Sequence, residues 1–347
     1  MSAPKILEVE QCLTASPRRW LVTGAAGFVA SHIAARLLEL GQEVVVLDNF
    51  STGYAHNIEG LLRQAEATRP GCRDKFTLIE GDIRDLDCCR RATAGVSYVL
   101  HQAALGSVPR SVLKPLETLA VNVDGFGNIL EAIRGERGCE SLVYASSSSV
   151  YGDSPELPKS ESQQGRPLSP YAASKQVNET YASAWTQSYG ATCRGLRYFN
   201  VVGTRQDPQG AYAAVIPRWI SSLLAGEAPT IFGDGETSRD FCPVQNVVEA
   251  NILAATAPST TDDVFNIALG GRTTLNELFI MLKDGMKILG LGSAPPTPRY
   301  EPFRHGDIRH SHADIDRARS QLGYAPRVSL AQGLETTMRW FYERDAN

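Results

Sequence analysis

The sequence predicts an α/β fold in which helices cover both faces of a parallel sheet. Two observations support this prediction: short, nearly continuous apolar runs recur through the first half of the chain, and helix-length segments separate them. Strands that are buried on both faces have this uninterrupted apolar character, and parallel strands need helical crossovers between them. The length of 347 residues is sufficient for such a domain and for a second, smaller α/β lobe.

The first predicted strand is W-L-V-T-G at 20–24, and a helix with apolar residues at helical spacing follows at 28–40. Gly41 is a typical stop for that helix. Further apolar runs that predict strands lie at 43–48, 76–82, 98–104 and 141–147.

The second half of the chain has a different texture, because loops rich in Pro, Gly and Asp dominate it. Between these loops, helices are expected at 213–225, 246–257, 274–289 and 330–343. We therefore place a first domain at 1–196, including an N-terminal extension at 1–19. The second lobe is placed at 197–347, and parts of it can cross back to the first domain.

The composition excludes several classes of protein. Hydrophobic residues make up 43% of the chain and charged residues 21%, which is not the composition of a disordered protein. A net charge of −4 supplies no broad basic face, so nucleic acid is not expected as a partner. No run of about 20 apolar residues predicts a membrane span. The N-terminus lacks the apolar core of a signal peptide, so we expect a cytoplasmic protein.

The cysteines and histidines do not form a metal-binding pattern. The seven cysteines include no C-x-x-C pair. His305, His310 and His312 lack accompanying ligands at a suitable spacing. We expect reduced thiols and no metal site.

A glycine-rich loop follows the first predicted strand. In T-G-A-A-G-F-V-A, the residues Gly24, Gly27 and Ala30 have the spacing G-x-x-G-x-x-A. Glycine allows a tight turn and a close backbone approach to a pyrophosphate, and the next helix presents free N–H groups to the anion. Since the motif lies between a predicted strand and a predicted helix, it indicates a Rossmann-type dinucleotide site.

Residues at the ends of later strands extend this site. Asp48 ends the second strand, where a carboxylate accepts hydrogen bonds from ribose hydroxyls and repels a 2′-phosphate, so NAD is favoured over NADP. Asp82 and Ile83 are placed to meet the adenine. The fourth strand ends on Gln102, Ala103 and Ala104, at the edge of the sheet where such ligands lie.

A catalytic group is predicted from S-S-S-S at 146–149 and S-P-Y-A-A-S-K at 169–175. Tyr171 and Lys175 are four residues apart and share one helix face. A free tyrosine, with a pKa near 10, is a poor base at neutral pH, but a neighbouring ammonium favours its phenolate. A serine hydroxyl at the preceding strand end can hold the substrate oxygen and share its proton.

These motifs make the chain similar to the extended short-chain dehydrogenase/reductase superfamily, and within it to the nucleotide-sugar 4-epimerases. Further matching segments are L-D-N-F-S-T-G, G-D-I-R-D, H-Q-A-A, S-S-V-Y-G-D, L-R-Y-F-N-V-V-G, G-D-G-E-T-S-R-D-F and R-H-G-D-I-R-H-S. The segments A-L-G-S-V-P-R-S (104–111) and G-A-Y-A-A-V-I-P-R-W (210–219) resemble bacterial UDP-N-acetylglucosamine 4-epimerases of O-antigen, that is lipopolysaccharide, biosynthesis.

The resemblance implies a set of residues that bind a tightly held NAD. They are Gly24, Gly27, Phe28, Val29, Asp48, Asn49, Ser51, Thr52, Gly53, Asp82, Ile83, Gln102, Ala103, Ala104, Tyr171, Lys175 and Tyr198. It also makes Ser147 the catalytic serine, Tyr171 the base and Lys175 its partner. Two departures from the family pattern are Ala30, in place of the third loop glycine, and the additional Ser146, which leaves the choice among neighbouring serines open.

The resemblance also implies a UDP-sugar site. Its residues are Gly106, Ser107, Ser147, Ser148, Ser149, Tyr171, Asn200, Ala214, Val215, Ile216, Thr230, Ile231, Phe232, Arg239, Arg304, Asp307 and Ser311. Asn200 corresponds to a phosphate and sugar contact, and the segments 214–216 and 230–232 correspond to uracil contacts. Arg239 and Arg304 correspond to a diphosphate clamp, for which the planar guanidinium is suited.

In the same way, Asp307 corresponds to a ligand of the uridine ribose. Ser311 falls where strict UDP-galactose epimerases carry a bulky tyrosine, so by sterics it leaves room for a 2-acetamido group.

The activity implied by this resemblance is reversible C4 epimerisation of UDP-N-acetylglucosamine to UDP-N-acetylgalactosamine through a 4-keto sugar. Alternatives are a 4-epimerase of UDP-N-acetylglucosaminuronic acid, for which Arg110 is a candidate contact, or of UDP-glucose and UDP-galactose. Ser148 and Ser149 stand where dehydratases and decarboxylases of this fold carry acidic residues, which disfavours those reactions. A non-catalytic NAD sensor is a remote alternative.

The family commonly forms a homodimer through two helices. In this chain they correspond to 118–133 and 172–188, although packing within one chain would explain their apolar faces equally well.

Overall fold

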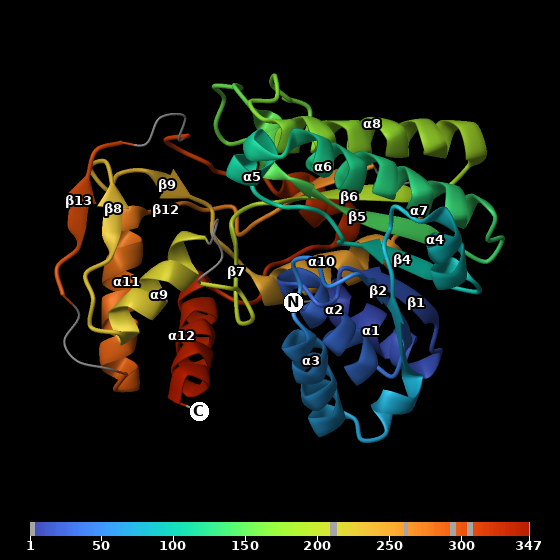
Figure 1. The fold of residues 1–347 in the computed structure, drawn as a ribbon, viewed down its shortest axis with the longest axis horizontal. Coiled ribbons are helices and arrows are strands. Elements are labelled where there is room, and N and C mark those ends of the chain that lie inside the picture. The colour runs from blue at the N-terminus through green and yellow to red at the C-terminus, as the bar shows by residue number, and fades with distance from the viewer. Residues whose placement is uncertain (1–3, 209–213, 260–262, 292–295, 304–307, 347) are drawn as a thin grey trace.

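The structure of the protein, a computed structural model, describes residues 4–208, 214–259, 263–291, 296–303 and 308–346. Its centre is a seven-stranded sheet in the order β11-β6-β5-β4-β1-β2-β3, and every neighbouring pair is parallel (Figure 1). The strands are β1 (Arg19–Thr23), β2 (Glu43–Asp48), β3 (Phe76–Glu80), β4 (Tyr98–His101), β5 (Ser141–Ser147), β6 (Cys193–Tyr198) and β11 (Val264–Ile267). The predicted doubly wound α/β fold is confirmed.

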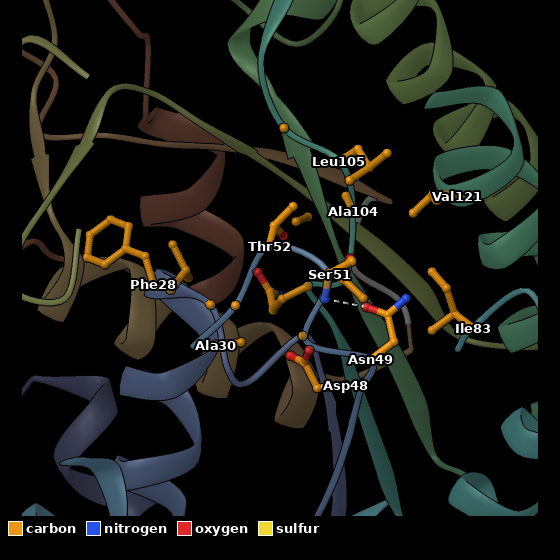
Figure 2. Close-up of a pocket in the computed structure, with 18 of the residues that line it drawn as sticks. Phe28, Ala30, Asp48, Asn49, Ser51, Thr52, Ile83, Ala104, Leu105 and Val121 are labelled. Atoms are coloured by element: carbon orange, nitrogen blue, oxygen red, sulfur yellow. Dashed lines mark hydrogen bonds between the residues drawn. The ribbon is translucent and has the colours of Figure 1, made fainter. Parts of the chain in front are cut away.

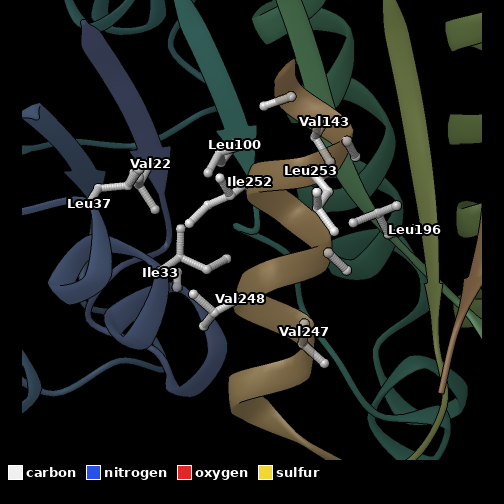
Figure 3. Close-up of a cluster of buried hydrophobic side chains, with 14 of the residues drawn as sticks. Val22, Ile33, Leu37, Leu100, Val143, Leu196, Val247, Val248, Ile252 and Leu253 are labelled. Carbon is white, nitrogen blue, oxygen red and sulfur yellow. The ribbon is translucent and has the colours of Figure 1, made fainter. Parts of the chain in front are cut away.

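Helices cover both faces of the sheet. One face carries α1 (Lys5–Ala15), α2 (Phe28–Glu39), α3 (Ala55–Thr68) and α10 (Val244–Thr256). The other carries α4 (Leu86–Thr93), α7 (Gly125–Arg134) and α8 (Pro170–Tyr189). On the first face, Ile252 and Leu253 of α10 lie against strand residues such as Val143 (Figure 3). Truncating one of these side chains to alanine costs roughly 2–5 kcal/mol in a packed core.

A smaller lobe has its own apolar core. It is built from α9 (Val215–Leu224), α11 (Leu275–Leu289), α12 (Leu330–Ala346) and the paired strands β8 (Thr230–Phe232) and β13 (Arg299–Glu301). A capping box between Thr274 and Glu277 fixes the start of α11. Two short ladders complete the strands: β7 (Val201–Val202) with β10 (Cys242–Pro243), and β9 (Ser238–Arg239) with β12 (Thr273–Thr274).

The chain crosses between the two lobes more than once. The boundary expected at 196/197 falls inside β6, and α10 and β11 return from the second half of the chain to the large sheet. The N-terminal extension contains α1, whose Ile6 and Leu13 are buried. Instead of one helix over 118–133, the structure has α6, a π-helical turn η2 and α7. The remaining elements are η1 (Cys72–Lys75), α5 (Val108–Leu113), α6 (Pro115–Leu119), η2 (Ala120–Asp124), η3 (Ser148–Tyr151) and η4 (Ala318–Leu322).

None of the helices in the described part of the chain has the length and apolar character needed to cross a membrane.

Candidate active site

A cleft of about 470 Å³ opens at the carboxyl ends of β1, β2, β4 and β5 (Figure 2). All seventeen residues expected at the NAD site line this cleft, and so do Gly106 and Ser147 from the expected sugar site. Parallel α/β sheets bind ligands at this edge, because the strand ends and the helix N-termini meet there. The cleft therefore brings the glycine-rich loop and the Tyr–Lys pair into one site.

The glycine-rich loop lies tightly against the end of β4. Gly24 has φ +77°, and a Cβ at this position would lie 2.9 Å from the Cα of Ala103. Glycine meets both requirements, the left-handed backbone and the close approach. Gly27 is the N-cap of α2 and has no capping side chain, so the first N–H groups of this helix are left for an anion.

Two carboxylates stand beside the loop. The Asp48 carboxylate accepts hydrogen bonds from the backbone N–H groups of Ala26 and Phe50, both at 2.8 Å, and burial raises its pKa. The hydrogen bonds with Arg84 lower the pKa of Asp82 to about 2. Asn49 Nδ2 also donates to Asp82 Oδ2 at 2.7 Å. Asp48 thus organises the loop while remaining at the cleft wall, which fits a ribose contact and disfavours a 2′-phosphate.

Apolar side chains that were not predicted complete the wall. Leu105 and Val121 face the cleft beside Ile83, as Figure 2 shows, and Val201 lines it as well. Leu105 lies in the loop after β4, and Val121 lies in the π-helical turn η2. Leu105 belongs to the segment 104–111, from which only Gly106, Ser107 and the end residue Ala104 were expected at the site, and Val121 belongs to no motif. The fold places both side chains next to the cofactor loop.

Helix α8, which carries the predicted catalytic pair, begins just before Tyr171. Pro170 occupies its first turn, and Ser169 caps the helix by accepting a hydrogen bond from the N–H of Ala172 at 3.1 Å. Tyr171 is hydrogen-bonded to Ser147 at the end of β5. The Lys175 ammonium lies 6.0 Å from the centre of the Tyr171 ring and donates to the carbonyl of Ala145 at 2.8 Å.

Burial dominates the electrostatics of this pair. It raises the pKa of Tyr171, and the hydrogen bond from Ser147 counteracts part of this effect. It lowers the pKa of Lys175 to about 8, although the negative charge of Glu179 opposes the change. His101, below Lys175, has its pKa lowered to about 3, first by burial and then by the Lys175 charge. At neutral pH the site therefore contains a charged Lys175 beside an uncharged His101.

The structure separates the roles of the neighbouring serines. Ser146 turns inward and donates to Glu179 Oε1 at 2.6 Å, whereas Ser147 meets Tyr171. Ser147 also accepts the N–H of Ser149 at 3.1 Å, and the buried hydroxyl of Ser149 has no partner. Ser148 begins the turn η3 and does not line the cleft. Of the four serines, Ser147 is thus the one that is hydrogen-bonded to Tyr171, the predicted base.

Comparison with known proteins agrees with this geometry. The family model described as the NAD dependent epimerase/dehydratase family matches residues 20–268. The chain belongs to this family. The UDP-glucose 4-epimerase of Mycolicibacterium smegmatis is 40% identical over 325 residues, which are 93% of this chain and 98% of that protein.

Solved structures are similar over the same extent. One is described as a UDP-N-acetylglucosamine 4-epimerase from Methanobrevibacter ruminantium in complex with UDP-N-acetylmuramic acid; it has a TM-score of 0.85 and 37% identity, and the match covers 94% of this chain and 99% of that one. The UDP-glucose 4-epimerase of Thermus thermophilus, in complex with NAD, has a TM-score of 0.78 and 35% identity over 93% and 98% of the two chains. NAD is the cofactor of this epimerase/dehydratase family member.

The residues expected at the sugar-nucleotide end are more dispersed than those of the NAD site. Among the described residues, Val201 is the last along the chain to line the cleft. Asn200 is exposed, and Ala214 caps the start of α9. The side chains of Ile216 and Ile231 lie in the core of the small lobe, so at these positions only the backbone is free to meet a base. Val215, Thr230 and Phe232 are half-buried around them.

Arg239 and Ser311 are brought together at the edge of the small lobe. Ser311 N–H donates to the carbonyl of Ser238 at 3.0 Å, and the Arg239 guanidinium donates to the same carbonyl at 2.9 Å. Ser107, which has φ +97°, caps α5. Arg304 and Asp307 lie outside the described residues. The structure therefore assembles the cofactor end fully, while these sugar-nucleotide contacts stay predictions.

Sequence reasoning also missed a buried ion pair behind the catalytic helix. Glu179 and Arg197 form two hydrogen bonds, and neither residue lines the cleft. Glu179 continues the spacing of Tyr171 and Lys175 by four residues, a signal that the sequence did contain.

Proposed function

We propose that this protein catalyses the reversible C4 epimerisation of UDP-N-acetylglucosamine to UDP-N-acetylgalactosamine through a 4-keto sugar. The observation that supports this reaction is that Ser147, at the end of β5, and Tyr171 and Lys175, on α8, all line the cleft that contains the glycine-rich loop. NAD supplies a reversible hydride acceptor at this site. We assign its binding to residues 1–196 and that of the UDP-sugar to the lobe beyond them.

Each catalytic side chain has one role. Tyr171, as the phenolate, removes the proton of the 4-hydroxyl and returns it at the end of the cycle. Ser147 donates to the phenolic oxygen and shares the proton of the substrate. Lys175 is held by the Ala145 carbonyl and stabilises the phenolate by its charge. This pairing allows a tyrosine to act as a base near neutral pH.

Inversion at C4 requires that the sugar present both of its faces to the cofactor. The UDP moiety must therefore stay bound while the 4-keto sugar turns about its diphosphate link. We assign the binding of UDP to the small lobe, with Arg239 and Arg304 on the diphosphate and Asp307 on the ribose. Asn200 and the backbone of 214–216 and 230–232 would meet the phosphate, sugar and uracil.

The choice of sugar depends on residues at the rim of the lobe. Ser311 has a small side chain and leaves space for a 2-acetamido group, which favours the N-acetylated substrate over UDP-glucose. The alternative substrate UDP-glucose is favoured by the names of two similar epimerases. UDP-N-acetylglucosaminuronic acid stays a third candidate, with Arg110 near the sugar as its cation.

One experiment separates these substrates. The purified protein, without added NAD, is incubated in parallel with UDP-N-acetylglucosamine, UDP-N-acetylglucosaminuronic acid and UDP-glucose, and products are followed by NMR. We expect rapid appearance of UDP-N-acetylgalactosamine, which would also establish a tightly bound cofactor. Preference for the uronic acid or for UDP-glucose would reassign the substrate. No conversion of any of the three, with NAD supplied, would contradict the proposed reaction.

A homodimer is proposed as the active assembly. The described helices α5, α6 and α8 lie next to one another at one side of the molecule (Figure 1). Their outer faces expose large apolar side chains: Val112, Leu113, Leu116, Leu119 and Tyr181. Exposed apolar patches of this kind mark interfaces.

We place this enzyme in the cytoplasm, where its product would supply an acetamido sugar for O-antigen synthesis.

A further inference from the structure

Glu179 is the third member of a polar row along α8. Tyr171, Lys175 and Glu179 are separated by four residues each, which puts them on one face of the helix. The proposed reaction uses the first two and leaves Glu179 without a role. Its side chain is nevertheless only 7% exposed, and a carboxylate is costly to bury unless its charge is compensated. The surroundings of Glu179 must therefore stabilise its charge.

Both carboxylate oxygens of Glu179 are hydrogen-bonded. Arg197, on β6, donates from Nε to Oε1 at 2.9 Å and from Nη2 to Oε2 at 2.8 Å. Ser146, on β5, donates to Oε1 at 2.6 Å, and Gln164 donates to Oε2. Ser146 immediately precedes Ser147 in the strand. Glu179 therefore connects the catalytic helix to the strand end that carries the catalytic serine.

Arg197 is itself held in place. Its Nη1 donates to the hydroxyl of Tyr151 and to the carbonyl of Glu161, both at 3.0 Å. Tyr151 in turn donates to Asn266 Oδ1 at 2.5 Å, on β11. Arg197 is therefore hydrogen-bonded to three residues, Glu179, Tyr151 and Glu161. This network holds the Glu179 carboxylate at the buried face of α8.

The charges that face Lys175 come from several elements. His101 on β4 is neutral at physiological pH, since its pKa is lowered to about 3. Tyr171 and Glu179 face Lys175 from its own helix. Tyr144 on β5 is buried near Glu179 and stays protonated, because burial raises its pKa well above 10. Glu179 is the anion that opposes the effect of burial on Lys175.

We propose that Glu179 is a positioning residue of the catalytic site: through Ser146 it holds the strand end that carries Ser147 against α8, and it places a negative charge on the helix face of Lys175. This inference rests on the proposed function of Tyr171 and Lys175. A buried ion pair is not in itself evidence of stability, because well-packed apolar residues often replace such a pair without loss. Because the negative charge of Glu179 raises the pKa of Lys175 on the same helix face, its loss should have a measurable effect on the titration of that ammonium.

The first test is the pH dependence of kcat/KM for wild type and Glu179→Gln. Loss of the negative charge lowers the pH at which Lys175 loses its proton, by about one unit for a nearby charge. We expect kcat/KM to fall roughly tenfold at pH 9 and less than twofold at pH 6.5, with KM for the UDP-sugar nearly unchanged. Glu179→Asp keeps the charge and should keep the wild-type alkaline limb.

The matched control is Glu249→Gln. Glu249 lies on α10 and forms a similar double hydrogen bond with Arg327, far from Lys175 in the sequence and outside the cleft. This variant loses a Glu–Arg ion pair in which the Arg327 side chain is 37% exposed, and it should retain the wild-type profile. If Glu179→Gln does not retain NAD, Glu179→Gln/Arg197→Met removes both buried charges together. Its alkaline limb should shift in the same direction by less, because loss of the Arg197 cation partly offsets loss of the Glu179 anion.

A second readout does not depend on turnover. The Lys175 side chain is titrated by ¹³C NMR in the NAD-bound protein, and its signal is assigned with Lys175→Met. We expect the midpoint to fall by about one pH unit in Glu179→Gln. An unshifted midpoint and an unshifted alkaline limb would overturn the role of Glu179, even with an active wild type. If the Lys175 midpoint shifts in Glu179→Gln but the wild-type protein epimerises no UDP-sugar, the role of Glu179 would be supported and the proposed function contradicted.

Discussion

At the scale of single residues, the proposed reaction depends on the Tyr171 phenol, which is buried before substrate arrives. Burial raises the pKa of Tyr171, so the phenolate needs both the hydrogen bond of Ser147 and the charge of Lys175. We expect Tyr171→Phe to lower kcat about 10²- to 10⁴-fold, as the loss of a general base does. NAD content after purification should stay unchanged.

The matched control for this substitution is Tyr342→Phe, on the exposed surface of α12, which should retain full activity. Near wild-type turnover of Tyr171→Phe would show that another group removes the proton.

The pKa of Lys175 sets a limit on activity at high pH. Because burial lowers this pKa to about 8, Lys175 is charged below that pH and neutral above it. The phenolate loses its stabilising cation as the pH rises through this value, so kcat/KM should decline above about pH 8. A pH–rate profile from pH 6 to 10 measures this limb, and a flat profile to pH 10 would contradict the role given to Lys175.

At the scale of elements, the glycine-rich loop leaves no space for a side chain at Gly24. Gly24→Ala would force a left-handed backbone on alanine, which costs about 1–2 kcal/mol, and would press its Cβ against Ala103 at 2.9 Å. We expect a lower Tm and loss of bound NAD, measured by thermal unfolding and by cofactor absorbance.

Gly71→Ala separates the two effects of that substitution. Gly71 has φ +81°, but nothing lies within 4 Å of its added Cβ. The Gly71→Ala variant should therefore lose stability from backbone strain alone and retain NAD. Equal NAD content in both variants would show that contact with Ala103 does not matter for the cofactor site.

The sequence predicted those elements whose signal is local. The apolar runs at 43–48 and 141–147 coincide with β2 and β5 in full. Strand β6 lacks such a run, because C-R-G-L-R-Y carries two arginines; both are buried, Arg194 on backbone carbonyls such as that of Ala254 and Arg197 on Glu179. Only tertiary partners make those arginines compatible with a central strand.

The candidate site also contains some residues that local sequence spacing predicts and others that only the fold brings together. Tyr171 and Lys175 were predictable since one turn of helix separates them. Leu105 and Val121 were not, because they come from a loop and a π-helical turn that meet only in the folded chain.

At the scale of the whole molecule, the two lobes are not independent units. The chain leaves the large sheet after β6 and returns to it with α10 and β11. Asn266, on β11, accepts from Tyr151 and donates to the carbonyls of Lys159 and Asp314. The strand that completes the large sheet therefore also anchors segments that lead toward the sugar-nucleotide lobe. In the proposed mechanism, such cross-connections would let that lobe hold UDP at a fixed distance from the cofactor while only the sugar turns.

The assembly of two such molecules gives the last prediction. Leu116 on α6 is 78% exposed, beside the apolar side chains of α5 and α8. A homodimer would bury about 800 Å² per partner, and a lysine at its centre would be desolvated without a counter-charge. We expect Leu116→Lys to shift the protein from dimer to monomer in light scattering after size-exclusion chromatography.

The matched control for this substitution is Ile288→Lys on α11, where Ile288 is 82% exposed. This variant should stay dimeric, because it removes a similar apolar side chain from a different face. A wild-type monomer, or a dimer that Leu116→Lys leaves intact, would place the interface elsewhere. Since α8 carries Tyr171 and Lys175 on the face toward the sheet and Tyr181 on its outer face, the same helix would connect the dimer to the catalytic pair.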